Sequence, residues 1–283
     1  RIDKYYQLTL FIKKASIMEH LLNTRNLTIG YDNKDIVKNL SIEIPAGKIT
    51  AIVGANGCGK STILKTIARL LSPKQGQVLL DGKSIHSLTT KDVATQLAIL
   101  PQNPVAPDGL TVSELVAYGR YPHQKAFSTH SKEDYKIIHW AIESTGLTAF
   151  EDHPVDELSG GQRQRAWIAL ALAQKTPILL LDEPTTYLDM GHQLEVLNLI
   201  KKLNDEQQRT IVMVVHDLNH ATRFADHLIC IKNGELYTQG HPIEVLSDQM
   251  LKDVFQIEAS ILIEPKTGLP VCIPTECIGA QNV

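Results

Sequence analysis

The sequence contains no long hydrophobic run. Across its 283 residues no stretch of eighteen or more apolar residues occurs, and the mean hydropathy is −0.08. A helix needs about 20 predominantly apolar residues to cross a bilayer. We therefore expect a chain that does not span a membrane by itself, so that any membrane role has to be peripheral.

Cysteines and blocks of basic charge are also scarce. The four cysteines match neither the spacing of a zinc site nor that of a secreted disulfide framework, which favours a reducing compartment; they are Cys58, Cys230, Cys272 and Cys277. The net charge is −3, and no block of five or six basic residues occurs. This argues against nucleic acid as a partner, and we expect protein and nucleotide instead.

The two ends of the chain differ from its middle. Residues 1–17 begin without methionine, and their apolar patch is too short for a secretory signal. Because Met18 directly precedes the first strand pattern, we expect it to be the natural start and residues 1–17 to be a non-native or disordered extension. After Phe255 the signals weaken, and residues 257–283 are expected to form a C-terminal extension with short strands at 261–263 and 269–273.

Between these ends, short apolar runs alternate with helical patterns, which indicates an α/β fold with a parallel sheet. Asn233-Gly234 predicts a tight hairpin turn. Two capping-box patterns, at 111–114 and 131–134, predict an inserted helical region over about 101–157. The predicted strands cover residues 21–29, 36–44, 49–53, 178–181, 210–215, 228–231 and 235–238.

A glycine-rich loop with the pattern G-x-x-x-x-G-K-S follows the predicted strand at 49–53. The backbone N–H groups of such a loop surround phosphate oxygens, and the helix that begins at Lys60 adds its dipole. We expect Lys60 to reach the β- and γ-phosphates of a nucleotide and the Ser61 hydroxyl to bind Mg²⁺. A turn that binds nothing is the alternative. The predicted nucleotide-binding residues of the loop are Gly54, Asn56, Gly57, Cys58, Gly59, Lys60, Ser61 and Thr62.

Two acidic residues follow the apolar run at 178–181, at the strand end where open α/β sheets bind ligands. Asp182 is expected to hold the hydration shell of Mg²⁺, and Glu183 to polarise an attacking water as a base. Two acids that merely end a strand at the surface are the alternative, which fits Glu183 better than Asp182.

A second glycine-rich turn, Leu158-Ser-Gly-Gly-Gln162, opens a predicted helix. Ser159 can cap this helix, and two glycines expose its first N–H groups, so the turn can bind an anion. By itself it could be a plain helix cap. Together with the phosphate loop and the acidic pair, it indicates a nucleotide contact through Ser159, Gly160, Gly161 and Gln162.

In this order, the motifs resemble those of the nucleotide-binding domain of ATP-binding cassette (ABC) transporters. The match covers about residues 21–256, and the implied domain covers residues 18–256. The correspondence covers the Walker A loop at 54–61, a Q-loop glutamine at Gln102, the signature at 158–162, Walker B at 178–183, the D-loop at 187–189 and a switch histidine at His216. The resemblance implies an ABC-type P-loop ATPase core with an antiparallel β region and an inserted helical subdomain.

The resemblance also implies roles for single residues. Tyr31 would stack on adenine, Gln102 would contact Mg²⁺ and water, Asp189 would touch a partner subunit, and His216 would bind the γ-phosphate. Their ordinary alternatives are a turn tyrosine, a loop amide, a helix cap and a strand-end histidine. The implied assembly is a head-to-tail dimer around two ATP–Mg²⁺, each held by the Walker A loop of one copy and residues 159–162 of the other.

Cys58 lies beside a helix N-terminus and Lys60, conditions that lower the pKa of a thiol. A redox-sensitive thiol is one hypothesis for it, and a small, tolerated loop residue is the favoured one.

Five segments narrow the resemblance to ATPases of ferric-siderophore importers, above all the ferric-enterobactin type: 56–62, 110–116, 119–124, 161–168 and 182–189. Without that resemblance, residues 119–124 would be interpreted as a solvated loop. The implied partners are integral-membrane permease subunits and, indirectly, a substrate-binding protein, at the cytoplasmic face of the plasma (inner) membrane. The alternatives are a vitamin B12 or haem importer ATPase, a non-transport ABC ATPase acting on the ribosome or DNA, and a regulatory protein with an inactive P-loop.

Overall fold

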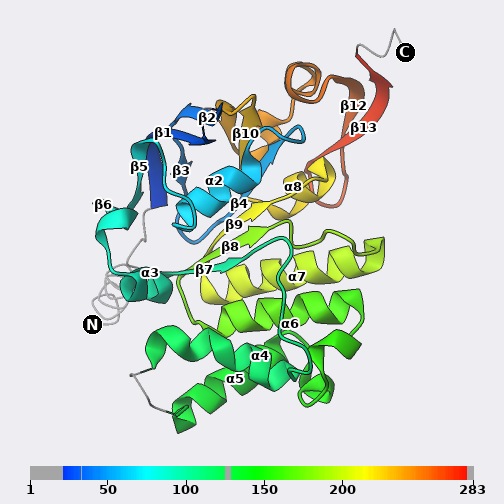
Figure 1. Ribbon diagram of the computed structural model, residues 1–283. Helices are drawn as coiled ribbons and strands as arrows, with labels where there is room; N and C mark the ends of the chain where they lie inside the picture. The colour runs from blue at the N-terminus through cyan, green and yellow to red at the C-terminus, as the bar shows by residue number, and fades with distance from the viewer. Residues whose placement is uncertain (1–21, 33, 125–128, 279–283) are drawn as a thin grey trace, which may run out of the picture.

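The computed structural model describes residues 22–32, 34–124 and 129–278, so the predictions for residues 1–17 lie outside the described residues. At its centre is a six-stranded sheet in the order β11-β10-β4-β9-β8-β7 (Figure 1). Neighbouring strands are parallel except for the β10–β11 hairpin. The strands are β4 (Ile49–Gly54), β7 (Leu97–Leu100), β8 (Ile178–Asp182), β9 (Thr210–Val214), β10 (His227–Lys232) and β11 (Glu235–Gly240). The α/β class and the hairpin at Asn233-Gly234 are thus confirmed.

An antiparallel sheet covers one side of this core, in the order β2-β1-β5-β6 with β3 paired to β1. The single strand predicted at 36–44 is wrong, because the chain breaks between β2 and β3. At the break, the Thr24 hydroxyl donates to Leu40 O (3.0 Å) and accepts from Ile42 N (3.1 Å). The strands are β1 (Leu22–Tyr31), β2 (Lys34–Leu40), β3 (Glu43–Ile44), β5 (Gln75–Leu80) and β6 (Lys83–Ser84).

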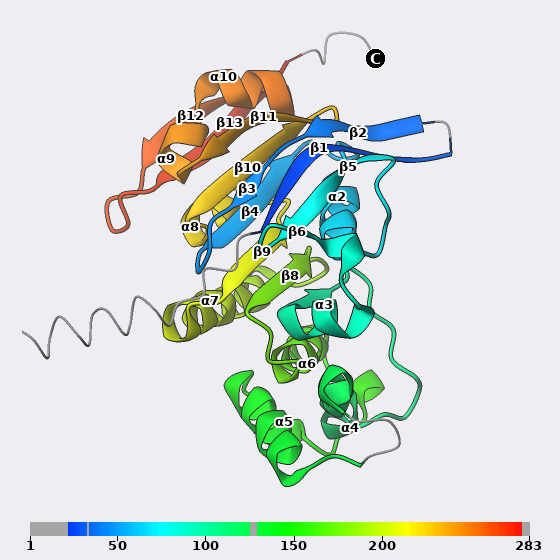
Figure 2. The same cartoon turned by 90° about the vertical axis from the view of Figure 1, so that its left-hand side faces the viewer.

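Helices pack on both faces of the central sheet, and Figure 2 shows α4 and α5 far from the antiparallel strands. Both predicted capping boxes are present, at Thr111 with Glu114 and at Ser131 with Asp134. The longer helices are α2 (Lys60–Ile67), α3 (Thr90–Gln96), α4 (Val112–Ala117), α5 (Lys132–Ser144), α6 (Gly160–Ala173), α7 (Met190–Gln207) and α8 (Leu218–Phe224). Short helical segments are Ile85–Ser87, Tyr118–His123, Thr148–Phe150, Val155–Glu157, α9 (Pro242–Val245), α10 (Asp248–Met250) and Leu251–Phe255.

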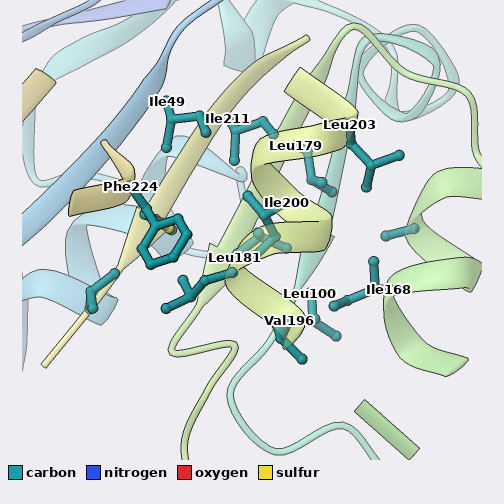
Figure 3. Close-up of a cluster of buried hydrophobic side chains, with 14 of the residues drawn as sticks. Ile49, Leu100, Ile168, Leu179, Leu181, Val196, Ile200, Leu203, Ile211 and Phe224 are labelled. Atoms are coloured by element: carbon teal, nitrogen blue, oxygen red, sulfur yellow. The ribbon is translucent and has the colours of Figure 1, made fainter. Parts of the chain in front are cut away.

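Apolar side chains on both faces of the central sheet hold these layers together. Leu179 and Leu181 pack with α6 and α7, as Figure 3 shows, whereas Leu180 packs on the other face with α2 and the antiparallel strands. Strands β8 and β9 are buried along their whole length, as expected for parallel strands covered on both faces. This packing brings the loops after β4, β7, β8 and β9 to one edge of the sheet.

The chain ends in a hairpin of β12 (Ile257–Ile263) and β13 (Pro270–Cys277). Both strands are longer than the sequence predicted. The hairpin lies against α8, at the end of the molecule away from α4 and α5 (Figure 1). Within the described ranges, no helix combines the length and apolar character needed to cross a membrane.

Candidate functional site

The glycine-rich loop between β4 and α2 encloses a small cavity. Gly57 (φ +77°) and Gly59 (φ +105°) have left-handed backbones, and a Cβ at Gly59 would lie 2.9 Å from Val37 Cγ2. Glycine is therefore needed at Gly59 for both conformation and space. The cavity has a volume of about 270 Å³ and is lined by Ile36, Asn56, Gly57, Gly59, Lys60, Ser61, Thr62, Glu183 and His216.

Lys60 lies beneath the loop and is 5% exposed. Its ammonium group donates to the carbonyl oxygens of Gly54 (2.9 Å) and Ala55 (3.0 Å). These bonds hold the cation at the wall of the cavity, where an anion of phosphate type can share it.

Ser61 and Asp182 meet below the same cavity. The Ser61 hydroxyl donates to Asp182 Oδ1 at 2.8 Å, while Asp182 Oδ2 is buried and has no hydrogen-bond partner among the described residues. Burial raises the pKa of the Asp182 carboxyl, against the lowering effect of the Ser61 hydrogen bond. An unpartnered buried carboxylate oxygen is costly, and a hydroxyl and a carboxylate are hard oxygen ligands. The pair therefore fits Mg²⁺.

Glu183 is the centre of a polar cluster. Its Oε1 lies 2.5 Å from His216 Nε2, and its Oε2 accepts hydrogen bonds from the Gln102 amide and from the Thr186 hydroxyl. Gln102, Glu183 and His216 follow three adjacent strands, β7, β8 and β9, which explains their convergence. No role for Thr186 could be predicted from the sequence, because its side chain reaches Glu183 only in the folded chain.

Glu183 also has an unusual backbone, with φ +55°. A residue other than glycine rarely adopts this left-handed region, and such conformations gather at functional sites. The turn aims the carboxylate across the mouth of the cavity.

The signature turn lies at the start of α6. Ser159 Oγ accepts from Gln162 N (3.3 Å), and Gln162 Oε1 accepts from Ser159 N (2.9 Å), so the predicted cap is confirmed as a full capping box. Within the described chain, residues 159–162 do not line the phosphate-loop cavity. The two glycine-rich turns are thus separate in one copy.

The D-loop aspartate, Asp189, caps helix α7, which was the ordinary alternative given for it from the sequence. Asp189 Oδ1 accepts from His192 N (2.9 Å), and its Oδ2 lies 2.8 Å from His192 Nδ1. The His192 ring also packs on Gly161, where an added Cβ would come 2.6 Å from His192 Cδ2. His192, which the sequence analysis did not single out, therefore joins the D-loop to the signature turn.

Three predicted nucleotide-binding residues, Tyr31, Gly54 and Cys58, lie outside the cavity lining. Tyr31 ends β1 and is 49% exposed, so its ring is accessible. Cys58 is buried, and this burial raises the pKa of its thiol despite the charge of Lys60. The expected lowering of the Cys58 pKa is therefore wrong, because desolvation outweighs the cation. Ile36, for which the sequence predicted no role, does line the cavity.

Residues 119–124 are not simply a solvated loop. Gly119 approaches α6 so closely that a Cβ would lie 2.3 Å from Leu170 O. Arg120, 5% exposed, donates to Ala173 O (2.7 Å) and to Asp134 Oδ1 (2.8 Å). This segment fastens α4, α5 and α6 together.

Known proteins resemble this chain over most of its length. The model of the ABC transporter family matches residues 37–186. The chain is 55% identical to the iron(3+)-hydroxamate import ATP-binding protein FhuC of Bacillus subtilis, over 91% of this chain and 96% of the relative. It is 47% identical to the ferric enterobactin transport ATP-binding protein FepC of Escherichia coli, over 89% and 93%.

Among solved structures, the dimeric structure of MJ0796, a bacterial ABC transporter cassette, superposes with a TM-score of 0.68 at 31% identity, covering 78% of this chain and 98% of that one. The chain therefore belongs to the ABC transporter family and is one of its ATP-binding subunits.

Proposed function

We propose that this chain is the ATP-hydrolysing subunit of an importer of ferric siderophores. The observation that carries the enzymatic part is the cluster of Gln102, Glu183 and His216 at the mouth of the phosphate-loop cavity. The cargo follows from the relatives, whose names specify iron(3+)-hydroxamate import and ferric enterobactin transport. The higher identity to the first favours a hydroxamate chelate over the ferric-enterobactin type.

In the proposed reaction, the loop N–H groups and Lys60 stabilise the phosphate charge of ATP. Glu183, oriented by Gln102 and Thr186, accepts a proton from the attacking water, and His216 bridges Glu183 and the γ-phosphate. Ser61, Asp182 and Gln102 would hold Mg²⁺, which would supply positive charge to neutralise the phosphates of ATP. Tyr31, exposed at the end of β1, would stack on adenine.

We propose that two copies complete each site. Because the signature turn does not line the cavity of its own copy, a second copy in head-to-tail orientation would supply residues 159–162 to the γ-phosphate. The exposed D-loop supports this arrangement, since Tyr187 is 87% exposed and Asp189 lies at the surface. Residues 18–256 would form this ATPase domain, with residues 257–283 as an extension.

The proposed membrane partner is a permease, which would contact a cleft of about 270 Å³ between the loop after β7 and the start of α6. Val105 is 88% exposed at its rim, near Arg163 and Trp167. The same loop carries Gln102, so a contact there would reach Glu183. This role implies a peripheral location at the cytoplasmic face of the plasma membrane, with a substrate-binding protein acting only through the permease.

The enzymatic proposal is tested with Glu183→Gln. The amide cannot accept the proton of the attacking water, so turnover should fall by on the order of a hundredfold or more while ATP affinity stays within about threefold. ATP should then trap a dimer, measured by light scattering. Glu195→Gln is the matched control, because Glu195 is an exposed residue of α7 that forms an ion pair with Arg165 of α6. A fully active Glu183→Gln chain would refute the assigned role.

The cargo is tested separately by uptake. In cells that lack their own siderophore-import ATPase, the chain and its permease should restore uptake of a ⁵⁵Fe-labelled hydroxamate chelate. Restoration of vitamin B12 or haem uptake instead would contradict the proposed cargo without affecting the ATPase assignment.

A further inference from the structure

We propose that the C-terminal hairpin is a brace for the switch histidine and that Asn219 is its positioning residue. The inference rests on the proposed function of the site and deepens it, because it gives the extension after Gln256 a task in ATP hydrolysis. His216 is followed directly by Asp217 and by α8, and α8 is the element that β13 contacts.

Asn219 pairs with the hairpin backbone as a strand would. Its Oδ1 accepts from Cys272 N (2.8 Å), and its Nδ2 donates to Cys272 O (3.0 Å). One side chain thus satisfies both main-chain groups of a buried residue of β13, and losing it would leave both without a partner. A second bond is made by Thr222, 1% exposed, whose hydroxyl donates to Pro270 O (3.1 Å).

Helix α8 depends on contacts with the rest of the fold for its stability and position. It has seven residues, and isolated helices shorter than about 12 residues are marginal in water. Its first turn is tied to the residue after the switch histidine, because Asp217 Oδ1 accepts from Asn219 N (2.7 Å) and His220 N (3.0 Å). Asp217 is therefore fixed to the same turn that Asn219 fixes to β13, and His216 directly precedes Asp217 in the chain.

Packing leaves α8 partly unsupported on the side of α7. A cavity of about 310 Å³ lies between the two helices and the hairpin turn, lined by Met190, Leu194, His220, Arg223, Leu269 and Pro270, among others. Because this space is not filled by side chains, the hydrogen bonds to β13 carry more of the restraint on α8. The same restraint keeps His216 within reach of Glu183, 2.5 Å from Nε2 to Oε1.

Loosening the brace should impair the chemical step more than nucleotide binding. Lys60 and the loop N–H groups do not contact α8, so ATP binding is retained, whereas a displaced His216 no longer bridges Glu183 and the γ-phosphate. A misplacement of about 1 Å in a catalytic group can cost on the order of a hundredfold in rate. We expect a smaller loss here, because Thr222 and the core residues of α8 remain.

The test compares Asn219→Ala with Thr275→Ala in the full chain. Thr275 donates to Glu258 O within the hairpin and is exposed, so its variant disturbs the hairpin without touching α8. Asn219→Ala should lower kcat about tenfold with KM for ATP within about twofold, and Thr275→Ala should change neither. Thr222→Val should lower kcat less than Asn219→Ala does. Thr222→Ser keeps the hydroxyl and should therefore keep kcat at the wild-type value.

A spectroscopic readout separates positioning from stability. In nucleotide-free, histidine-labelled protein, well below its Tm, Asn219→Ala should shift the His216 ring resonances, assigned with His216→Gln, while the His139 resonances stay unchanged. Unshifted His216 resonances, or a kcat equal to wild type, would overturn the proposal. If wild-type protein lacked ATPase activity the proposed function would fail, yet the resonance shift would still report the brace.

Discussion

At the residue scale, His192 occupies a position where two loops of the site depend on one side chain. Its ring nitrogen pairs with Asp189 of the D-loop, and its ring carbons pack on Gly161 of the signature turn. In the proposed dimer both loops face the partner copy. The geometry of the two loops is therefore fixed within one copy before any partner arrives.

A substitution at Gly161 tests this dependence. Gly161→Ala places a Cβ 2.6 Å from His192 Cδ2, so the ring has to move and release Asp189. We expect a loss of about 1 to 3 kcal/mol in the free energy of unfolding, as for other overpacked sites, measured by urea unfolding of the nucleotide-free chain.

Gly160→Ala is the control for this prediction, because its Cβ would meet only Leu188 Cδ2 at 3.6 Å. Alanine is favoured over glycine within a helix by roughly 1 kcal/mol, so this variant should be neutral or slightly more stable. Equal destabilisation by both substitutions would contradict the packing role of His192.

At the element scale, the segment after α4 is joined to α5 by the ion pair of Arg120 with Asp134 and to α6 by a hydrogen bond from Arg120 to Ala173 O. Arg120 Nε lies 2.8 Å from Asp134 Oδ1, and the two side chains are 7% and 13% exposed. Although desolvation acts in the opposite direction, hydrogen bonds from Ser131 and Arg120 lower the pKa of Asp134 to about 2. The carboxylate is thus stabilised by both its helix cap and its ion pair.

This pKa predicts a dependence of stability on pH. Because the folded-state pKa lies below the ordinary value of 3.8, the stabilisation is fully present above about pH 5 and is lost as the pH falls toward 2. Asp134→Asn should cost about 1 to 2 kcal/mol at pH 7, allowing for solvent screening, and this difference should shrink between pH 5 and pH 3.

The measurement is urea unfolding followed by tryptophan fluorescence, since Trp140 lies on α5. Glu133→Gln is the matched control, because the pair of Glu133 with Lys136 is exposed, 3.7 Å apart, and exposed pairs contribute little. A difference between wild type and Asp134→Asn that grows on acidification would reverse the predicted sign.

The features that depend only on residues close together in the sequence were predicted well. The capping boxes at Thr111 and Ser131 need only four consecutive residues, and Asn233-Gly234 needs only a turn. The break between β2 and β3 depends on Thr24, far away in sequence, and the close approach of Gly119 depends on Leu170. Such features could not be predicted because their causes lie in tertiary contacts.

In the candidate site, too, the residues placed by local sequence could be predicted and those placed by tertiary contacts could not. Glu183 and His216 each follow a predicted strand and Gln102 follows β7, so the parallel sheet brings the three side chains to one edge. Thr186, Ile36 and His192 complete the site through side-chain directions that only the fold determines. The pKa of Cys58 was predicted in the wrong direction because its burial, which raises the pKa, could not be seen from the loop pattern.

At the scale of the whole molecule, the two glycine-rich turns of one copy lie apart. The phosphate loop, Glu183 and His216 line one cavity, and the signature turn lies outside it. If a head-to-tail dimer joins the halves, each functional site takes its phosphate loop from one copy and its signature turn from the other. Defects in the two halves should then complement each other.

Mixing two inactive variants tests this directly. Lys60→Met removes the phosphate-binding cation, and Ser159→Arg blocks the signature turn, so each variant alone should hydrolyse ATP at the background rate. In an equal mixture half of the dimers are mixed, and each mixed dimer has one intact site, so about a quarter of the wild-type rate should return. The control mixes Lys60→Met with His216→Gln, both defective in the same half, and should recover nothing. A mixture of the first pair that stays inactive, although cross-linking detects mixed dimers, would contradict the shared site.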